Sequence, residues 1–226
     1  GASTTPPSPA LASLATASDQ HAWDPDHTLE AEMLSGHVEG RLLSLLVKLS
    51  GARRVLDVGT FTGYSALAMA EALHETNRDS ATAAGVVTTG VVTCELDADV
   101  AAMASEAFRA SPAGDLIRVE VGPAVDTLQR LADAGERFDL AFLDADKPGY
   151  LTVFHTLLDR SLVGPGALIV ADNTLLQGEP YGDPALAGPN GRAIAEFNAA
   201  VADDPRVEQV LLSVRDGVTL ARVRDS

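Results

Sequence analysis

LAFLDADK at residues 140–147 and ALIVADN at residues 167–173 are two apolar runs that each end in acidic side chains. Each run has the length and composition of a buried parallel strand. A stretch with helical spacing, around residues 150–162, separates them. Consecutive strands joined by one helix usually lie side by side and end at the same edge of the sheet. The sequence therefore predicts a strand–helix–strand unit whose acidic ends meet.

The polar residues at these two ends suit a metal site. Asp144, Asp172 and Asn173 offer hard oxygen ligands, which favour Mg²⁺, with Ca²⁺ or Mn²⁺ as alternative ions. Lys147 follows Asp144 by three residues, and an amine beside a bound cation is a candidate general base. A single acid at a strand end is commonly only a helix cap. Two such ends, 28 residues apart, favour a shared site at the carboxyl edge.

The same alternation of strand and helix extends through most of the chain. Further apolar runs precede helical stretches, and the expected parallel strands are residues 54–59, 91–96, 117–122, 140–145 and 167–172. The runs at 207–214 and 217–223 are too close for a crossover, so they predict an antiparallel hairpin with its turn near Asp216 and Gly217. The predicted fold is α/β: a doubly wound, seven-stranded, mostly parallel sheet with an antiparallel C-terminal hairpin.

The N-terminal part adds helices to this sheet. Residues 29–49 show apolar positions at helical spacing, which predicts an amphipathic helix or a helix pair broken near Gly36. We expect residues 1–15 to be a disordered or tag-derived tail, because the first nine residues are rich in Ser, Thr and Pro. Residues 16–226 are expected to form a single domain. The connections at 75–90 and 178–191 are long, and we interpret the second as a lid or substrate-selecting loop.

The glycine loop DVGTFTGY, residues 57–64, follows the first strand of the predicted sheet. A dinucleotide site would need a glycine where Phe61 stands, so this loop disfavours a nicotinamide cofactor. It suits a ligand without a pyrophosphate, such as S-adenosylmethionine. Glu95 ends the next strand, where a carboxylate can accept both hydroxyls of a ribose. An ordinary strand-to-helix turn and a solvated acid are the alternatives for the loop and for Glu95.

Charge and cysteine content argue against several classes of binding partner and of metal site. Sixteen basic and thirty-two acidic residues give a formal net charge of −16. Without a Lys/Arg cluster, this argues against a nucleic acid or an anionic membrane as partner. Cys94 is the only cysteine, so the sequence has no disulfide frame and no thiolate zinc cage. We expect a soluble cytoplasmic protein with a small-molecule partner.

Four stretches together resemble one enzyme family, the cation-dependent O-methyltransferases of the caffeoyl-CoA and catechol O-methyltransferase type, which have the class I methyltransferase fold. The stretches are VLDVGTFTGYSALAMA (55–70), FDLAFLDADKPGY (138–150), IVADNTLLQG (169–178) and DPRVEQVLLSVRDGVTLARV (204–223). The likeness runs from about Met33 to Arg222. The longer connection at 75–90 and the HAWD segment around Trp23 depart from the family pattern.

The resemblance implies a homodimeric enzyme that uses S-adenosylmethionine and Mg²⁺. It places the metal on Asp144, Asp172 and Asn173, with the substrate's adjacent hydroxyls completing the shell, and it makes Lys147 the base and Asp144 a catalytic partner. The implied cofactor contacts are Met33, Ser35, Glu39, Asp57, Gly59, Thr60, Ser65, Glu95, Ala124, Asp144 and Tyr150.

The resemblance leaves the acceptor open. A net charge of −16 is a poor field for a polyanionic CoA thioester, so we favour a small free catechol-like phenol over an acyl-CoA. A monophenol or a nitrogen nucleophile is a second possibility for the acceptor. The competing classes are a nicotinamide-dependent oxidoreductase, which Phe61 disfavours, and a cofactor-binding module that has lost its chemistry.

Overall fold

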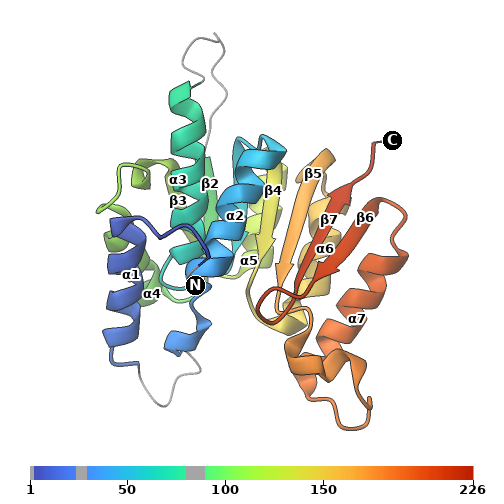
Figure 1. Ribbon diagram of the computed structural model, residues 1–226. Helices are drawn as coiled ribbons and strands as arrows, with labels where there is room; N and C mark the ends of the chain where they lie inside the picture. Colours follow the sequence, from blue (N-terminus) through green and yellow to red (C-terminus); the bar gives the residue numbers. More distant parts are fainter. Residues whose placement is uncertain (1–2, 24–29, 80–89, 226) are drawn as a thin grey trace. The chain divides into compact units, whose positions relative to one another are not determined.

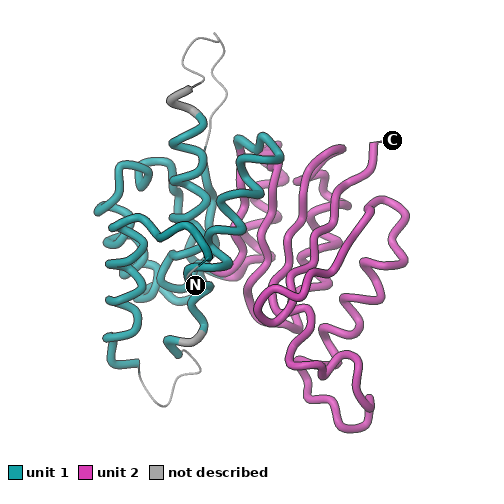
Figure 2. Tube along the Cα trace, viewed as in Figure 1, with its two compact units in different colours: residues 1–53, 60–122 teal, residues 54–59, 123–226 magenta. Residues whose placement is uncertain are grey.

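The computed structural model describes residues 3–23, 30–79 and 90–225 (Figure 1). The chain forms two compact units, one of residues 1–53 and 60–122 and the other of residues 54–59 and 123–226 (Figure 2). The single domain expected over residues 16–226 stays a prediction. The strand order is β3-β2-β1-β4-β5-β7-β6, which confirms the predicted seven-stranded α/β fold. No helix in the described ranges is long and apolar enough to cross a bilayer.

The first unit is a helical layer with two strands. Strands β2 (Gly90–Glu95) and β3 (Ile117–Val121) pair in parallel, with Val91 opposite Ile117. Helix α3 packs against both α1 and α2. The helices of this unit are α1 (Pro9–Gln20), η1 (Ala31–Met33), α2 (Gly36–Ser50), α3 (Tyr64–Asp79), α4 (Ala98–Phe108) and η2 (Gly114–Leu116).

The prediction of a disordered or tag-derived tail over residues 1–15 is wrong from Pro9 onward, where helix α1 begins. The Ser8 hydroxyl accepts a hydrogen bond from the Leu11 N–H at 3.1 Å and donates one to Glu71 at 2.8 Å. Pro9 occupies the first helical position, where its missing N–H costs nothing. Leu11 and Leu14 are buried. The composition suggested a tail, but a serine followed by proline is also a common start of a helix. Burial of two leucines offsets the entropy lost when the segment becomes ordered.

The break predicted near Gly36 is present, because η1 ends at Met33 and α2 begins at Gly36, which has a φ of 73°. The connection expected at 75–90 is shorter than predicted at its start, because α3 continues to Asp79. Residues 80–89, which contain the rest of that connection, lie outside the described residues.

The second unit carries the remaining five strands. In parallel pairs, β1 (Arg54–Val58) lies beside β4 (Phe138–Leu143), and β4 lies beside β5 (Val163–Asp172). Strand β7 (Val218–Val223) then pairs antiparallel with both β5 and β6 (Val207–Leu212), which confirms the predicted hairpin. Strand β4 is almost continuously buried, as expected for a central parallel strand with both faces covered.

Helices α5 (Ala124–Asp133), α6 (Tyr150–Asp159) and α7 (Pro189–Asp203) of the second unit pack next to one another in that order. The sequence analysis did not predict α7, although Ile194, Phe197 and Val201 recur at helical spacing and are buried. The segment interpreted as a lid contains part of η4 (Leu176–Tyr181) and leads into α7. η3 (Lys147–Gly149) precedes α6.

The hairpin turn also supports the residues that follow β5. Gly217 has a φ of 93°, and a Cβ there would come within 2.5 Å of the Leu175 nitrogen. The Leu175 N–H donates to the Asp216 carbonyl at 2.9 Å. Only glycine permits this approach, so the turn of the hairpin fixes the chain just beyond the predicted metal ligands.

The turn between α7 and β6 gives a prediction about stability and pH. Side-chain hydrogen bonds from Arg206 lower the pKa of Asp204, whose side chain is 8% exposed. We expect Asp204→Asn to lower the free energy of unfolding by about 1–2 kcal/mol at pH 7. Because the folded-state pKa is depressed, the difference should be full above the ordinary Asp value and disappear as pH falls through the lowered one.

Chemical denaturation at several pH values measures this difference. The matched control is Asp203→Asn, at an exposed neighbouring position in the last turn of α7. An unfolding free-energy difference that stays constant down to acid pH, or one that is equal for the control, would contradict the assignment.

Candidate active site

The pairing of β4 with β5 brings the two acidic strand ends together. Leu143 lies opposite Ala171 in this parallel pair, so Asp144 and Asp172 follow at adjacent positions on the carboxyl edge. The Asp144 N–H donates to the Val58 carbonyl at 2.8 Å, which ties the end of β4 to the end of β1. The expectation that the two runs form neighbouring strands is confirmed.

Gly59, one of the cofactor contacts that the resemblance implies, lies where the backbone after β1 crosses close to Asp144. Its φ is 111°, and a Cβ at this position would overlap the carbonyl oxygen of Asp144. The residue is therefore required for the close crossing of the two backbones, whatever ligand the site accepts. Asp57, two residues earlier in β1, is fully buried. Ala124 is half-buried at the start of α5.

Lys147 is held against the edge by two neighbours. Its Nζ donates to Asp144 Oδ1 at 3.2 Å and to the Tyr150 hydroxyl at 2.8 Å. The side chains of Lys147 and Asp144 are 13% and 17% exposed, so the ion pair is largely screened from water. Asp144 directly follows β4, and Lys147 begins η3, a turn that the proline at 148 favours. A positioned amine of this kind can accept or hold a proton.

The buried side chain of Tyr150 lies between the ends of β4 and β5. Its side chain is 1% exposed, and its hydroxyl lies 3.1 Å from both the Leu143 carbonyl and the Asp172 carbonyl. The hydroxyl has one hydrogen, so it donates to one of these carbonyls at a time and accepts from Lys147. Its ring packs edge-on against Phe197 of α7, at 5.4 Å between centroids. The predicted cofactor contact of Tyr150 stays a prediction; the contacts described show a residue that orders the site.

Asp172 and Asn173 end β5 in an unusual backbone geometry. Asp172 is 2% exposed, and Asn173 adopts a left-handed conformation with a φ of 55°. Two carboxylates and one amide oxygen are a ligand set that fits a hard divalent cation. Within residues 3–23, 30–79 and 90–225, no three His, Cys, Asp or Glu side chains cluster as a metal site. Asn173 offers an amide oxygen beside the two carboxylates, and water commonly fills the remaining positions around such a cation.

The glycine loop and Glu95 meet within the first unit. The Phe61 N–H donates to Glu95 Oε2 at 2.7 Å, and the Asp97 N–H donates to Oε1 at 3.0 Å. Thr60 is tied to β2 as well, because its N–H donates to the Cys94 carbonyl at 3.0 Å. Each carboxylate oxygen keeps a further lone pair, so Glu95 is oriented and can still accept hydroxyl groups.

Trp23 was not among the predicted site residues, yet it packs on the glycine loop. Its ring stacks on Phe61 at 4.8 Å between centroids, and its indole N–H donates to the Ser18 carbonyl at 3.1 Å. Ser18 in turn donates to the Thr62 hydroxyl at 2.7 Å. The HAWD segment that departs from the family pattern therefore contacts the loop through Trp23. Residues 24–29 lie outside the described part of the chain.

The other predicted cofactor contacts of the first unit differ in exposure. Ser65 at the start of α3 is buried, and so are Ser35 and Glu39 around the start of α2. Met33 is half-exposed at the end of η1. Nothing in these positions tests their contact with a cofactor, so the roles assigned to them stay predictions.

Comparison with known proteins identifies the family. Residues 9–224 match the model of a family described as O-methyltransferase. A probable caffeoyl-CoA O-methyltransferase of Dictyostelium discoideum is 32% identical over 83% of this chain and 76% of its own length. The family match includes the whole stretch from Met33 to Arg222 over which the likeness was expected.

Two solved structures agree with this assignment. The methyltransferase PaMTH1 of Podospora anserina, bound to SAH, has a TM-score of 0.82 and 29% identity over 99% of this chain and 92% of that one. The O-methyltransferase TomG of Streptomyces achromogenes, involved in tomaymycin synthesis and bound to SAM, has a TM-score of 0.80 and 29% identity over 99% and 93%. The family predicted from the four motifs is confirmed: this chain belongs to the O-methyltransferase family.

Proposed function

We propose that the protein transfers a methyl group from S-adenosylmethionine to one hydroxyl of a small vicinal diphenol, with a divalent metal ion at Asp144, Asp172 and Asn173. The observation that carries the proposal is the β4–β5 register, which brings Asp144 and Asp172 to adjacent positions at the strand ends, together with the ion pair between Lys147 and Asp144. Membership of an O-methyltransferase family supplies the reaction class. The solved relatives with SAH or SAM support the cofactor.

The metal would be Mg²⁺, with Ca²⁺ or Mn²⁺ as alternatives, because all three protein ligands are oxygens. When bound, the ion supplies Lewis acidity to the two adjacent oxygens of the acceptor. The chain's contribution is to keep Asp144 and Asp172 at a fixed spacing. The Tyr150 hydroxyl supports this spacing, because it lies 3.1 Å from the Leu143 carbonyl and from the Asp172 carbonyl and can donate to either one.

Lys147 is the proposed base. A neutral lysine amine has two N–H bonds and one lone pair, and its contacts with Asp144 and Tyr150 can use both N–H bonds. The lone pair then remains for the proton of the acceptor hydroxyl. In the overall reaction, a carbon–oxygen bond forms at the acceptor, the carbon–sulfur bond of the donor breaks, and the proton moves to Lys147.

All of the predicted cofactor contacts are retained in this proposal. Glu95 is the proposed ribose ligand, since the N–H groups of Phe61 and Asp97 orient its carboxylate. The remaining proposed contacts are Met33, Ser35, Glu39, Asp57, Gly59, Thr60, Ser65, Ala124, Asp144 and Tyr150. A nicotinamide cofactor has no support from the relatives, and Phe61 stands where its pyrophosphate would need glycine.

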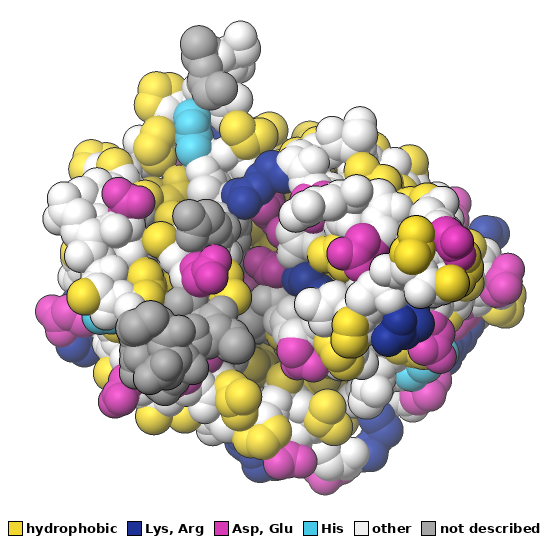
Figure 3. All heavy atoms as spheres, turned by 90° about the horizontal axis from the view of Figure 1, so that it is seen from below, with side chains coloured by type: hydrophobic (Ala, Val, Ile, Leu, Met, Phe, Trp, Pro, Cys, Tyr) yellow, Lys and Arg dark blue, Asp and Glu magenta, His cyan; other side chains and the backbone are white. Residues whose placement is uncertain are grey.

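The proposed acceptor is a free phenol and not a CoA thioester. Figure 3 shows acidic side chains spread over the face it displays, with Lys and Arg at separate places. A net charge of −16 disfavours a ligand that carries several phosphates. We also propose a homodimer, as the family resemblance implies, and a cytoplasmic location, with which a single cysteine is compatible. Sedimentation velocity would measure the oligomeric state.

The metal ligands give the first prediction. We expect Asp172→Asn and Asp172→Ala to abolish methylation of catechol at any Mg²⁺ concentration, since removing one charged ligand from this set weakens cation binding strongly. EDTA treatment should likewise abolish methylation by the wild type, and added Mg²⁺ should restore the wild-type activity. The readout is methylated product by mass spectrometry, with Asp133→Asn on the surface of α5 as control. Unchanged turnover after EDTA would refute the metal-dependent scheme.

Lys147 gives a second prediction, helped by the fact that Lys48 is the only other lysine. Lys147→Ala and Lys147→Arg should both lower kcat by on the order of 10²–10⁴, because neither side chain can take the proton at neutral pH. Affinity for S-adenosylhomocysteine, measured by calorimetry, should stay within about threefold. Lys48→Ala is the control, and it should keep full activity. If Lys147→Arg is fully active, positive charge and not proton transfer is what the position supplies.

The acceptor class gives a third prediction. The value of kcat/KM should be higher for free catechols than for caffeoyl-CoA, and raising the ionic strength should improve the CoA ester by screening repulsion. Initial rates at two salt concentrations check this. Faster turnover of caffeoyl-CoA at low salt would overturn the preference for a free phenol and leave the reaction type standing.

A further inference from the structure

Thr174, the residue after the proposed metal ligand Asn173, is held at each of its polar groups. Its N–H donates to the Gly217 carbonyl at 3.0 Å, and its hydroxyl accepts from Thr219 at 2.9 Å. Its carbonyl accepts from Asn198 Nδ2 at 2.8 Å. The side chain of Thr174 is fully buried. The backbone that leaves Asn173 is therefore fixed by the hairpin on one side and by α7 on the other.

This fixation matters because Asn173 has a left-handed backbone. A φ of 55° is uncommon for a residue with a side chain, and such a conformation persists where the surroundings determine it. The direction of the Asn173 amide depends on this backbone conformation. The hydrogen bonds of Thr174 are the first contacts beyond Asn173 that can maintain it.

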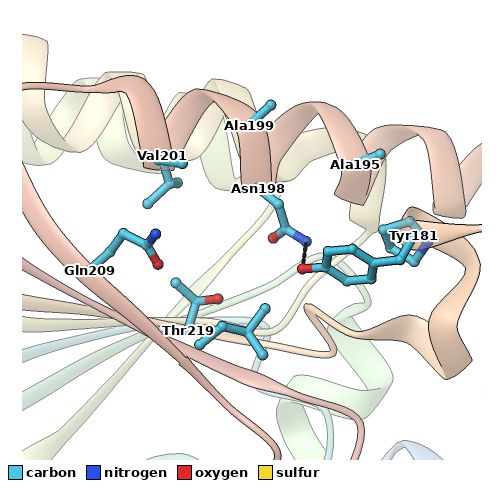
Figure 4. A pocket seen from close by; sticks show the side chains of 10 residues that line it. Tyr181, Ala195, Asn198, Ala199, Val201, Gln209 and Thr219 are labelled. Atoms are coloured by element: carbon cyan, nitrogen blue, oxygen red, sulfur yellow. Dashed lines mark hydrogen bonds between the residues drawn. The ribbon is translucent and has the colours of Figure 1, made fainter.

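Asn198 has a second contact, which extends the connection to the segment interpreted as a lid. The same Nδ2 lies 3.1 Å from the hydroxyl of Tyr181, at the end of η4 (Figure 4). The two hydrogens of the amide nitrogen are thus used by Thr174 and Tyr181. The opposite amide orientation would set two acceptors, Asn198 Oδ1 and the Thr174 carbonyl, against each other, so the network determines the orientation.

The oxygen of Asn198 faces a pocket that lies between α7 and the β6–β7 hairpin. This pocket has a volume of about 350 Å³, and Gln209 and Thr219 lie on the side of the Asn198 oxygen (Figure 4). Asn198 Oδ1 is buried and has no hydrogen-bond partner among the described residues. Among the described residues, the Asn198 amide therefore makes its hydrogen bonds only through its nitrogen, to Thr174 and to Tyr181.

We propose that Asn198 is a positioning residue for the metal site. By donating to the Thr174 carbonyl it maintains the left-handed backbone of Asn173, and by donating to Tyr181 it joins η4 to the same anchor. This inference rests on the proposed function, since it assigns a task to Asn198 in a site whose metal is itself proposed. It concerns a residue that contacts neither the metal position nor Lys147 in the contacts described.

Two variants separate the effects of the two hydrogen bonds that Asn198 donates. In Asn198→Asp the Tyr181 hydroxyl can turn and donate to the carboxylate, whereas the Thr174 carbonyl loses its donor and faces a negative charge. Tyr181→Phe removes the lid contact alone. We expect Asn198→Asp to weaken binding of Mn²⁺ by about 10-fold or more, the size typical of changes just outside a metal's ligands. Tyr181→Phe should keep the Mn²⁺ affinity within about twofold.

Mn²⁺ binding is measured by electron paramagnetic resonance of the unbound ion, with S-adenosylhomocysteine affinity determined by calorimetry on the same samples. The latter should be equal in all variants, and excess Mn²⁺ should restore the activity of Asn198→Asp. Gln209→Ala is the matched control, because it lines the same pocket without a described hydrogen bond to the turn. Asn198→Ala, which adds no charge, should also weaken Mn²⁺ binding.

The outcomes distinguish this inference from the proposed function. If the wild type binds no Mn²⁺, the proposed metal site fails. If the wild type binds Mn²⁺ and both Asn198 variants bind it equally well, the positioning role of Asn198 is overturned and the metal site stands. Tighter binding by Asn198→Asp would also overturn it, because added charge near the ion and not backbone support would then decide the affinity. Equal losses of Mn²⁺ and S-adenosylhomocysteine affinity would show a general structural defect and overturn it as well.

Discussion

The pairing of β4 with β5 is the constraint on which the site depends. Two paired parallel strands end at the same edge of the sheet. The residues that directly follow their last paired positions are therefore neighbours. Here those residues are Asp144 and Asp172. The hydroxyl of Tyr150 lies within hydrogen-bonding distance of carbonyls from both strand ends, which resists any sliding of one strand against the other.

Support for this edge comes in layers from different parts of the second unit. β1 contributes the Val58 carbonyl and Gly59, whose missing side chain lets the end of β1 approach Asp144. The β6–β7 hairpin and α7 hold Thr174, beyond the other strand end. Carboxylates of like charge repel one another when they are close, so these contacts oppose a separation of Asp144 from Asp172, and the Lys147 ammonium offsets the charge of Asp144.

The sequence was sufficient for the parts of the fold that depend on local pattern. Buried parallel strands are short apolar runs, and their alternation with helices was visible, so the strand ends at Asp144 and Asp172 could be predicted as neighbours. Helix α1 was missed because the composition of the tail outweighed the Ser8-Pro9 start. Helix α7 was missed because the Gly- and Pro-rich segment before it dominated the interpretation. The spacing of Ile194, Phe197 and Val201 was the available signal. The contacts of Gly59, Tyr150 and Asn198 could not be predicted, since each joins distant elements in a way that no local pattern encodes.

The proposed chemistry assigns metal binding to Asp144 and Asp172, proton transfer to Lys147, and activation of the acceptor oxygens to a divalent ion. Its central claim is direct contact between that ion and the acceptor. The most direct test is electron–nuclear double resonance on the Mn²⁺-loaded protein with S-adenosylhomocysteine and ¹⁷O-labelled catechol. The account predicts an ¹⁷O hyperfine coupling in the wild type that is absent in Asp172→Asn. Lack of any ¹⁷O coupling in a wild-type sample that methylates catechol with Mn²⁺ would contradict it.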